Sequence, residues 1–154
     1  MCQAWRMELI YEFTMRAQLG ETLIVGPTAV GVRMVVGVTA GTAHGDRING
    51  EFIPPGGDWI TIGPDGYGRL DVRAQLRTTD GAVIYVHYTG VLEMAKVQDK
   101  MLSGEEGSFD DAYFRTTPRL ETGDERYAWV NHTVFVGRGR VLPGAVEYEV
   151  FRVT

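Results

Sequence analysis

The chain opens with a regular alternation of apolar and polar positions. Between Met7 and Met15 every second side chain is apolar or aromatic, and the intervening residues are mostly charged or polar. Successive side chains of an extended strand point to opposite faces, so a period of two predicts a half-buried β-strand in this segment.

The clearest pattern lies in the middle of the chain. Leu70–Arg77 alternates apolar with polar residues, Thr79-Asp80-Gly81 follows, and Ala82–Thr89 resumes an extended pattern. An Asp-Gly pair between two such runs favours a β-hairpin, because glycine adopts the positive φ of the turn without a Cβ clash. We therefore predict two antiparallel strands joined at Gly81.

Further short segments rich in β-branched or alternating residues are separated by turns that contain glycine, proline or aspartate. They cover residues 22–25, 30–39, 47–53, 113–117, 127–136 and 145–153. After Val91 the spacing of Leu92, Ala95 and Met101 indicates one short helix within residues 91–104. Eight to nine antiparallel strands must protect their edges, and a closed barrel does this completely. The sequence thus predicts an all-β fold, a single antiparallel β-barrel domain over residues 1–154 with one short helix.

Composition narrows the class of protein. The 154 residues are 44% hydrophobic, enough for a packed core, and the formal net charge of −5 disfavours nucleic acid as a partner. Apolar runs are too short to span a bilayer, and Glu8 and Glu12 stand where a secretion signal would be apolar. Cys2 is the only cysteine, so no intrachain disulfide can form. We expect a soluble, cytoplasmic protein without nucleic-acid or membrane partners.

The sequence lacks the usual cofactor and nucleophile motifs. His44, His87 and His132 are not spaced as a metal-binding pair, although Glu51 near His44 gives a faint hint of one. No glycine-rich dinucleotide or phosphate loop occurs, and no Gly-x-Ser-x-Gly elbow presents a serine nucleophile. We therefore predict no metal, no cofactor and no covalent catalysis.

Asp71 and Arg73 are the first candidates for acid–base chemistry. They share one face of the predicted strand 70–77, opposite Leu70 and Val72. If that face lines the barrel lumen, the pair is a buried carboxylate and guanidinium that can orient a polar ligand. If it faces water, the pair is a surface ion pair that contributes little. Periodicity alone leaves both interpretations open.

Arg115 and Tyr88 extend this candidate catalytic set. Arg115 follows Phe114 in a predicted strand, where its forked donors suit an enolate or carboxylate, or else pair with Glu121 or Asp111 across a turn. Tyr88 lies on the second arm of the central hairpin and can donate a phenolic proton.

Five further residues are candidates for substrate binding. Tyr127, Trp129 and Asn131 alternate onto one face of a predicted strand, where they are either core residues or ligand contacts. Asp58 and Trp59 follow a run of two prolines and two glycines, at a turn or at the rim of a pocket. Burial of Asp58 would raise its pKa and make it an acid or base.

Three sequence blocks resemble a known family. They are Gly41–Trp59 with its Pro54-Pro55-Gly56-Gly57-Asp58-Trp59 run, Asp65–Ala82 with Leu70-Asp71-Val72-Arg73 and Thr79-Asp80-Gly81, and Tyr113–Gly137 with Tyr113-Phe114-Arg115-Thr116-Thr117-Pro118 and Tyr127-Ala128-Trp129-Val130-Asn131. In order and spacing the chain, from about Leu23 to its end, resembles the domain of unknown function 3237 family, also called uncharacterised protein family 0311. The resemblance implies a calycin-like β-barrel with an internal pocket and brings no established catalytic residues. At His44-Gly45-Asp46 the chain departs from the family's more usual Gly-Pro pair.

Taken together, these patterns predict a small-molecule-binding barrel. A lumen that holds a carboxylate, arginines and a tyrosine but no cofactor suits acid–base chemistry on a carbonyl-bearing or conjugated organic molecule, such as isomerisation, hydration, dehydration or cyclisation. Two alternatives stay open: a carrier that binds a small ligand without changing it, and a structural, oligomeric barrel filled by its own side chains. A homodimer is compatible with all three.

Overall fold

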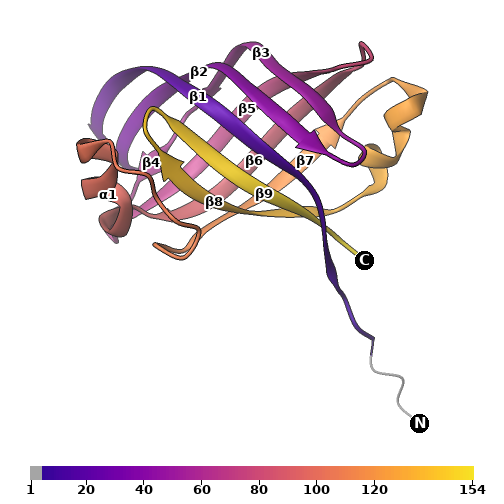
Figure 1. Cartoon of the computed structure of the whole chain (residues 1–154). Coiled ribbons are helices and arrows are strands. Elements are labelled where there is room, and N and C mark those ends of the chain that lie inside the picture. The colour runs from indigo at the N-terminus through magenta and orange to yellow at the C-terminus, as the bar shows by residue number, and fades with distance from the viewer. Residues whose placement is uncertain (1–4) are drawn as a thin grey trace.

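A computed structural model of the chain describes residues 5–154, so Cys2 lies outside the described residues. Long antiparallel strands wind into a barrel, as Figure 1 shows. The strands are β1 (Leu9–Thr28), β2 (Gly31–Gly45), β3 (Asn49–Asp58), β4 (Thr61–Ile62), β5 (Tyr67–Thr78), β6 (Val83–Glu93), β7 (Phe114–Glu121), β8 (Phe135–Leu142) and β9 (Ala145–Val153).

The sheet closes on itself. Its neighbours run β1-β9-β8-β7-β6-β5-β3-β2, and pairing of β2 with β1 completes the ring, while the short β4 bridges β2 and β5. Register shifts in the β1–β2 pair, for example between Leu19 and Thr22, bend these long strands around the barrel. Closure removes the exposed sheet edges, and the predicted antiparallel barrel is confirmed.

The central hairpin follows the predicted alternation. β5 and β6 pair from Tyr67 opposite Glu93 to Arg77 opposite Val83, and Gly81 turns the chain with φ of 93°. The apolar members of β5 point inward and are at most 5% exposed. They are Leu70, Val72, Ala74 and Leu76. The hairpin therefore gives the barrel wall a dry inner face and a wet outer face.

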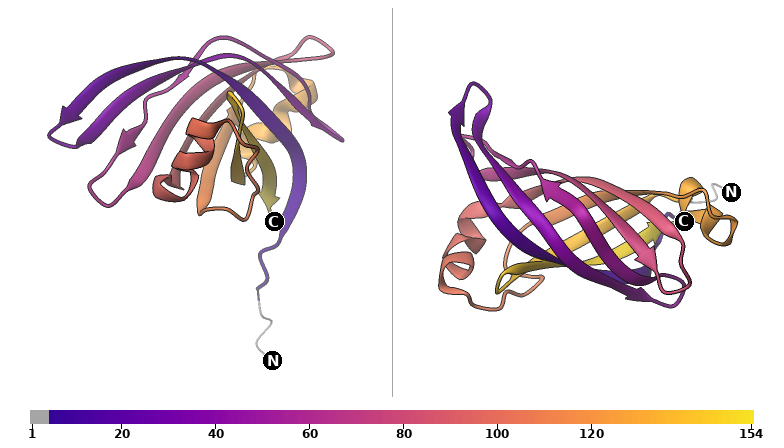
Figure 2. Two further views of the ribbon diagram at one scale, coloured as in Figure 1. Left: turned by 60° about the vertical axis from the view of Figure 1, so that its left-hand side comes forward. Right: turned by 90° about the horizontal axis from the view of Figure 1, so that it is seen from above.

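One end of the barrel carries the helix α1 (Met94–Ser103), which lies within the predicted range and ends at Gly104 in the left-handed conformation. The β1–β2 hairpin extends beyond the barrel wall at this same end, as the views in Figure 2 show. Residues of both elements line one internal cavity, among them Met34 of β2 and Met94 and Met101 of α1. No helix among residues 5–154 is long and apolar enough to cross a membrane.

The strand predicted over 127–136 is wrong for most of its length. Residues Glu125–His132 form a 3-10 helix, η1, and β8 begins only at Phe135. The Asp124 carboxylate caps the helix by accepting from the backbone N–H of Arg126. This local capping favours a helical turn where the alternation of aromatic residues indicated a strand.

Candidate functional site

The barrel interior contains a small chamber next to α1, which contributes Met94 and Met101 to its wall. Its volume is about 70 Å³, and most of its wall is aliphatic or aromatic, with Val36, Leu70 and Phe114 among the lining residues. The lining residues with polar side chains are Asp58, Tyr88 and Tyr148. A few convergent polar groups in an apolar hollow are the usual composition of a small-molecule site.

Asp58 is the last residue of β3. The β3–β5 register shifts between Ile53 and Gly57, where the Pro54-Pro55 peptide is cis, and regular pairing resumes with Asp58 opposite Val72. One carboxylate oxygen, Oδ1, accepts a hydrogen bond of 3.0 Å from the backbone N–H of Asp71. This bond fixes the carboxyl at the chamber wall.

The electrostatic environment of Asp58 favours its protonated form. Burial is the main reason that the pKa of the carboxyl rises from 3.8 to about 6. The Asp71 backbone hydrogen bond lowers this pKa, and the negative charge of Asp71 makes a smaller contribution in the raising direction. At neutral pH the carboxyl is therefore mostly ionised and can accept a proton. A general base works best when its pKa lies close to the working pH.

Tyr88 on β6, which pairs with Val72 on the other side from Asp58, and Tyr148 on β9 also line the chamber. Both are buried, and their rings meet edge to face with centroids 5.3 Å apart. Burial raises the pKa of both phenols above the ordinary value of 10, so both keep their protons at neutral pH. The negative charge of Asp58 acts on both in the same direction. The two phenols also interact with each other by a side-chain hydrogen bond, so the chamber holds one base and a linked pair of neutral hydroxyls.

A buried carboxylate elsewhere in the barrel differs from the partly buried Asp58. Glu12 lies near the N-terminal end of β1, and it is held by the Arg47 guanidinium and by Arg152, whose Nε is 2.8 Å from Oε1. A carboxylate that is neutralised by two arginines has a structural role by this geometry. The charge that acts on Asp58 is instead another carboxylate, which leaves it free to take up a proton.

The sequence is similar to a family of known proteins. The sequence model of the family described as "Protein of unknown function (DUF3237)" matches residues 7–153. The chain belongs to this family. A UPF0311 protein of Rhodopseudomonas palustris is 34% identical over 148 residues, which are 96% of this chain and 97% of that protein. The family resemblance predicted from the three sequence blocks is confirmed.

Solved structures agree with the barrel. A conserved protein of unknown function from Rhodopseudomonas palustris aligns with a TM-score of 0.90 at 32% identity, over 98% of this chain and 100% of that one. A β-barrel-like protein from Acinetobacter baumannii aligns with a TM-score of 0.84 at 26% identity and covers both chains fully. A more distant structure from Penicillium herquei shares the fold with a TM-score of 0.70 at 21% identity, over 97% of this chain and 94% of that one.

Within this DUF3237 barrel, Asp71 and Arg73 lie on the outer face, and the lumen interpretation is wrong for both. Their side chains are 40% and 47% exposed because the inward positions of β5 belong to the apolar members of the alternation. Arg73 Nη1 lies 3.2 Å from Asp71 Oδ1, and His87 Nε2 lies 3.1 Å from the same oxygen. This surface cluster is linked to the chamber by the Asp71 backbone N–H, which donates to Asp58, and by the charge of Asp71.

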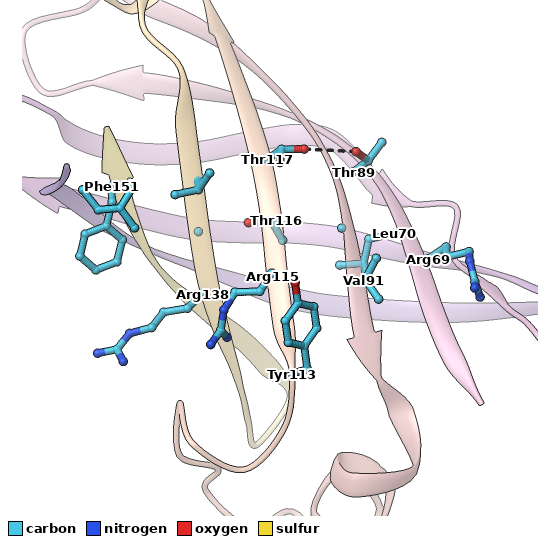
Figure 3. Close-up of a pocket in the computed structure, with 14 residues that line it drawn as sticks. Arg69, Leu70, Thr89, Val91, Tyr113, Arg115, Thr116, Thr117, Arg138 and Phe151 are labelled. Atoms are coloured by element: carbon cyan, nitrogen blue, oxygen red, sulfur yellow. Dashed lines mark hydrogen bonds between the residues drawn. The ribbon is translucent and has the colours of Figure 1, made fainter. Parts of the chain in front are cut away.

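Arg115 also points outward, so its predicted place in the lumen is wrong. Figure 3 shows it on the floor of an outer groove of about 1140 Å³, between Tyr113 and Arg138. Arg115 donates to the Phe114 carbonyl and lies 5.2 Å from the centre of the Tyr113 ring. The alternative pairing with Asp111 is not seen, because that carboxylate binds Lys100 at 2.7 Å. The groove is open to solvent, which screens its charges.

The residues of η1 have structural contacts. The Tyr127 hydroxyl donates to Asp80 at 2.8 Å, and the Trp129 ring stacks on the Arg47 guanidinium at 3.6 Å. Asn131 is exposed, and its amide accepts from and donates to the backbone of Thr122. A shared ligand-binding face for these three residues is therefore wrong, because a helical turn separates side chains that alternation would align.

Of the predicted site residues, Asp58 and Tyr88 come together in the chamber. Trp59 is not among the residues that line the chamber: it is 40% exposed, and its carbonyl accepts a solvent-exposed hydrogen bond from Arg33. Tyr148 was missed by the sequence reasoning. Its signal was present, since Val146, Tyr148 and Val150 alternate with Glu147 and Glu149 in β9. The pattern predicted the strand, but it could not show that Tyr148 meets Tyr88 across the lumen.

Proposed function

We propose that the barrel binds a small, uncharged organic molecule through a carbonyl group in the chamber and catalyses proton transfer without a cofactor. The observation that carries this proposal is the shared chamber of Asp58, Tyr88 and Tyr148, in which a carboxyl with a pKa of about 6 faces two protonated phenols. A base and a hydrogen-bond donor that line one apolar space are the elements that enolisation requires.

The step follows from the protonation states. The Asp58 carboxylate takes a proton from the carbon next to the carbonyl, and the electron pair of that C–H bond moves to the carbonyl oxygen. Tyr88 stabilises the developing oxyanion by hydrogen bonding and keeps its own proton. The protonated Asp58 then returns a proton to the same carbon or to a conjugated one, which gives exchange or isomerisation with atoms and charge balanced.

Two further observations support an enzyme of this kind. The chamber is lined mainly by apolar side chains, which exclude water and strengthen the electrostatic effect of each polar group. The structure from Penicillium herquei that shares the fold is described as that of an enzyme. A carrier would use the same chamber to hold a ligand unchanged, and this is the competing outcome of the test.

The test is hydrogen–deuterium exchange of small methyl ketones in D2O, followed by NMR at neutral pH. We expect the native protein to accelerate exchange at the α-carbon, and Asp58→Asn to lose about a hundredfold or more of that acceleration. Asp71→Asn is the matched control, because it removes a neighbouring carboxylate from the outer face. Tight binding of ketone without accelerated exchange would favour the carrier. Equal exchange rates with native protein and Asp58→Asn would contradict the role of this carboxyl.

A further inference from the structure

The apolar wall of the chamber continues outside the barrel along the β1–β2 hairpin. On β2 the chamber is lined by Val38, Val36 and Met34, and regular alternation places Val32 next on the same face. Burial declines along this row, from buried Val38 to Val32, which is 37% exposed. The row therefore leads from the interior to the outside as one aliphatic surface.

The paired strand supplies the second half of this surface. Directly paired residues share a face of an antiparallel ladder, and Ile24 pairs with Met34 while Pro27 pairs with Val32. Ile24 is 66% exposed although it faces the same side as the chamber wall. We call Ile24, Pro27 and Val32 the apolar ramp. Leu23 pairs with Val35 and belongs to the opposite face of the hairpin.

The helix α1 borders the same end of the chamber as Met34. Met94 and Met101 of this helix line the chamber together with Met34 of β2. Methionine side chains are flexible and adapt to differently shaped apolar partners. Figures 1 and 2 show the hairpin and the helix at the same end of the barrel. A ligand that leaves the chamber would pass between them and meet the ramp.

The size of the chamber makes this exit necessary for most ligands. Its volume of about 70 Å³ accommodates only a small fragment, since one water molecule occupies roughly 30 Å³ in the liquid. We propose that the ligand is a neutral amphiphile, with a carbonyl head in the chamber and a flexible hydrocarbon tail on the apolar ramp. This inference rests on the proposed function and names its substrate class.

The charges at the head of the site argue against a fatty acid. Asp58 is the carboxyl that lines the apolar chamber, and the charge of Asp71 on the outer face also acts to raise its pKa. A ligand carboxylate beside Asp58 would place a second negative charge in an apolar setting, which is unfavourable. A ketone offers the same tail with an uncharged oxygen that accepts from Tyr88 or Tyr148.

The experiment measures calorimetric affinity for straight-chain methyl ketones of five to eleven carbons. A fully buried methylene is worth up to about a fourfold change in affinity. We expect the native protein to gain about twofold to fourfold per added carbon once the chain is longer than the chamber. The double variant Ile24→Ser/Val32→Ser should lose this gain for the longer ketones and bind the shortest ones normally. Leu23→Ser, an exposed aliphatic substitution on the opposite face, should keep the gain.

The outcomes separate the two proposals. If native protein binds all lengths equally, or if Ile24→Ser/Val32→Ser keeps the length dependence, the tail inference is overturned while the head site stands. If affinity rises with length but Asp58→Asn exchanges ketone protons as fast as native protein, the ramp stands and the catalytic proposal fails. Binding of straight-chain fatty acids in preference to ketones, or no binding of any ketone, would overturn both. Normal binding of the shortest ketone by the double variant also shows that it is folded.

Discussion

The two faces of the β5–β6 hairpin carry very different chemistry although their residues alternate along the same strands. The outer face holds Asp71, Arg73 and His87, where the Asp71 carboxylate pairs with the Arg73 guanidinium and contacts the His87 ring in reach of solvent. The inner face holds Val72 and Tyr88, and Asp58 pairs with Val72 from the neighbouring strand. The charged cluster on the outer face stands out in the sequence, but water screens its charges and makes it a weaker candidate for catalysis. Burial raises the pKa values of Asp58 and Tyr88 on the inner face, which makes them the stronger candidates.

The largest expected effect comes from placing a charge on the dry face. Val72→Asp puts a carboxylate at a position that is 3% exposed, and we expect it to lower the free energy of unfolding by about 4 kcal/mol or more. Arg73→Asp, one residue along on the wet face, should cost less than about 1 kcal/mol. Urea denaturation followed by circular dichroism measures both. Equal losses would mean that the two faces do not differ as described.

The next effect concerns pH. The pKa of Asp58 is about 6 in the folded protein against 3.8 in an unfolded chain, so the folded state binds this proton more tightly. The stabilisation it gives is complete below about pH 4 and is lost as the pH rises through about 6. Each unit of difference between the folded and unfolded pKa values contributes about 1.4 kcal/mol to the free energy of unfolding, which gives about 2 to 3 kcal/mol in all.

Asp58→Asn removes this titration and provides the control. The loss of unfolding free energy between pH 4 and pH 7 should be smaller in the variant than in native protein by about 2 to 3 kcal/mol. Asp71→Asn should leave most of the loss in place. An identical pH dependence for native protein and Asp58→Asn would show that this carboxyl titrates normally.

A smaller effect is expected at the phenols. Tyr88→Phe removes one donor to the developing oxyanion and should slow ketone proton exchange about tenfold to a hundredfold, with Tyr148 limiting the loss. Tyr85→Phe is the matched control, because it lies on the same strand, pairs with Gln75, and is not part of the chamber wall. NMR exchange rates measure both variants. An exchange rate with Tyr88→Phe equal to that of the native protein would show that this tyrosine does not take part in the mechanism.

The smallest effect belongs to the outer cluster. Arg73→Ala breaks an ion pair whose partners are both substantially exposed, and we expect a change of less than about 1 kcal/mol in stability with no change in ketone exchange. Thermal unfolding and the exchange assay check the two parts. A tenfold lower rate of ketone proton exchange would show that the outer cluster contributes to function.

The sequence predicted the fold better than the site. Alternation in Leu70–Arg77 and the Asp80-Gly81 turn determine a hairpin locally, so this part needed no tertiary information. Alternation cannot show which face is inside, and this uncertainty put Asp71 and Arg73 in the lumen as candidates. Tyr148 and Asp58 are 90 residues apart in the sequence, and closure of the barrel brings them to the same chamber. In η1, capping by Asp124 overrode the alternation of Tyr127, Trp129 and Asn131.

The central claim is that Asp58, inside the barrel, is the group that meets the ligand. The most direct measurement is a carbon-13 NMR titration of the aspartate carboxyls, with Asp58→Asn to assign the signal, in the absence and presence of a methyl ketone. We predict that the Asp58 carboxyl titrates near pH 6 and that ketone shifts its resonance while the Asp71 resonance stays in place. An Asp58 carboxyl that titrates near pH 4 and does not respond to ketone would contradict the account.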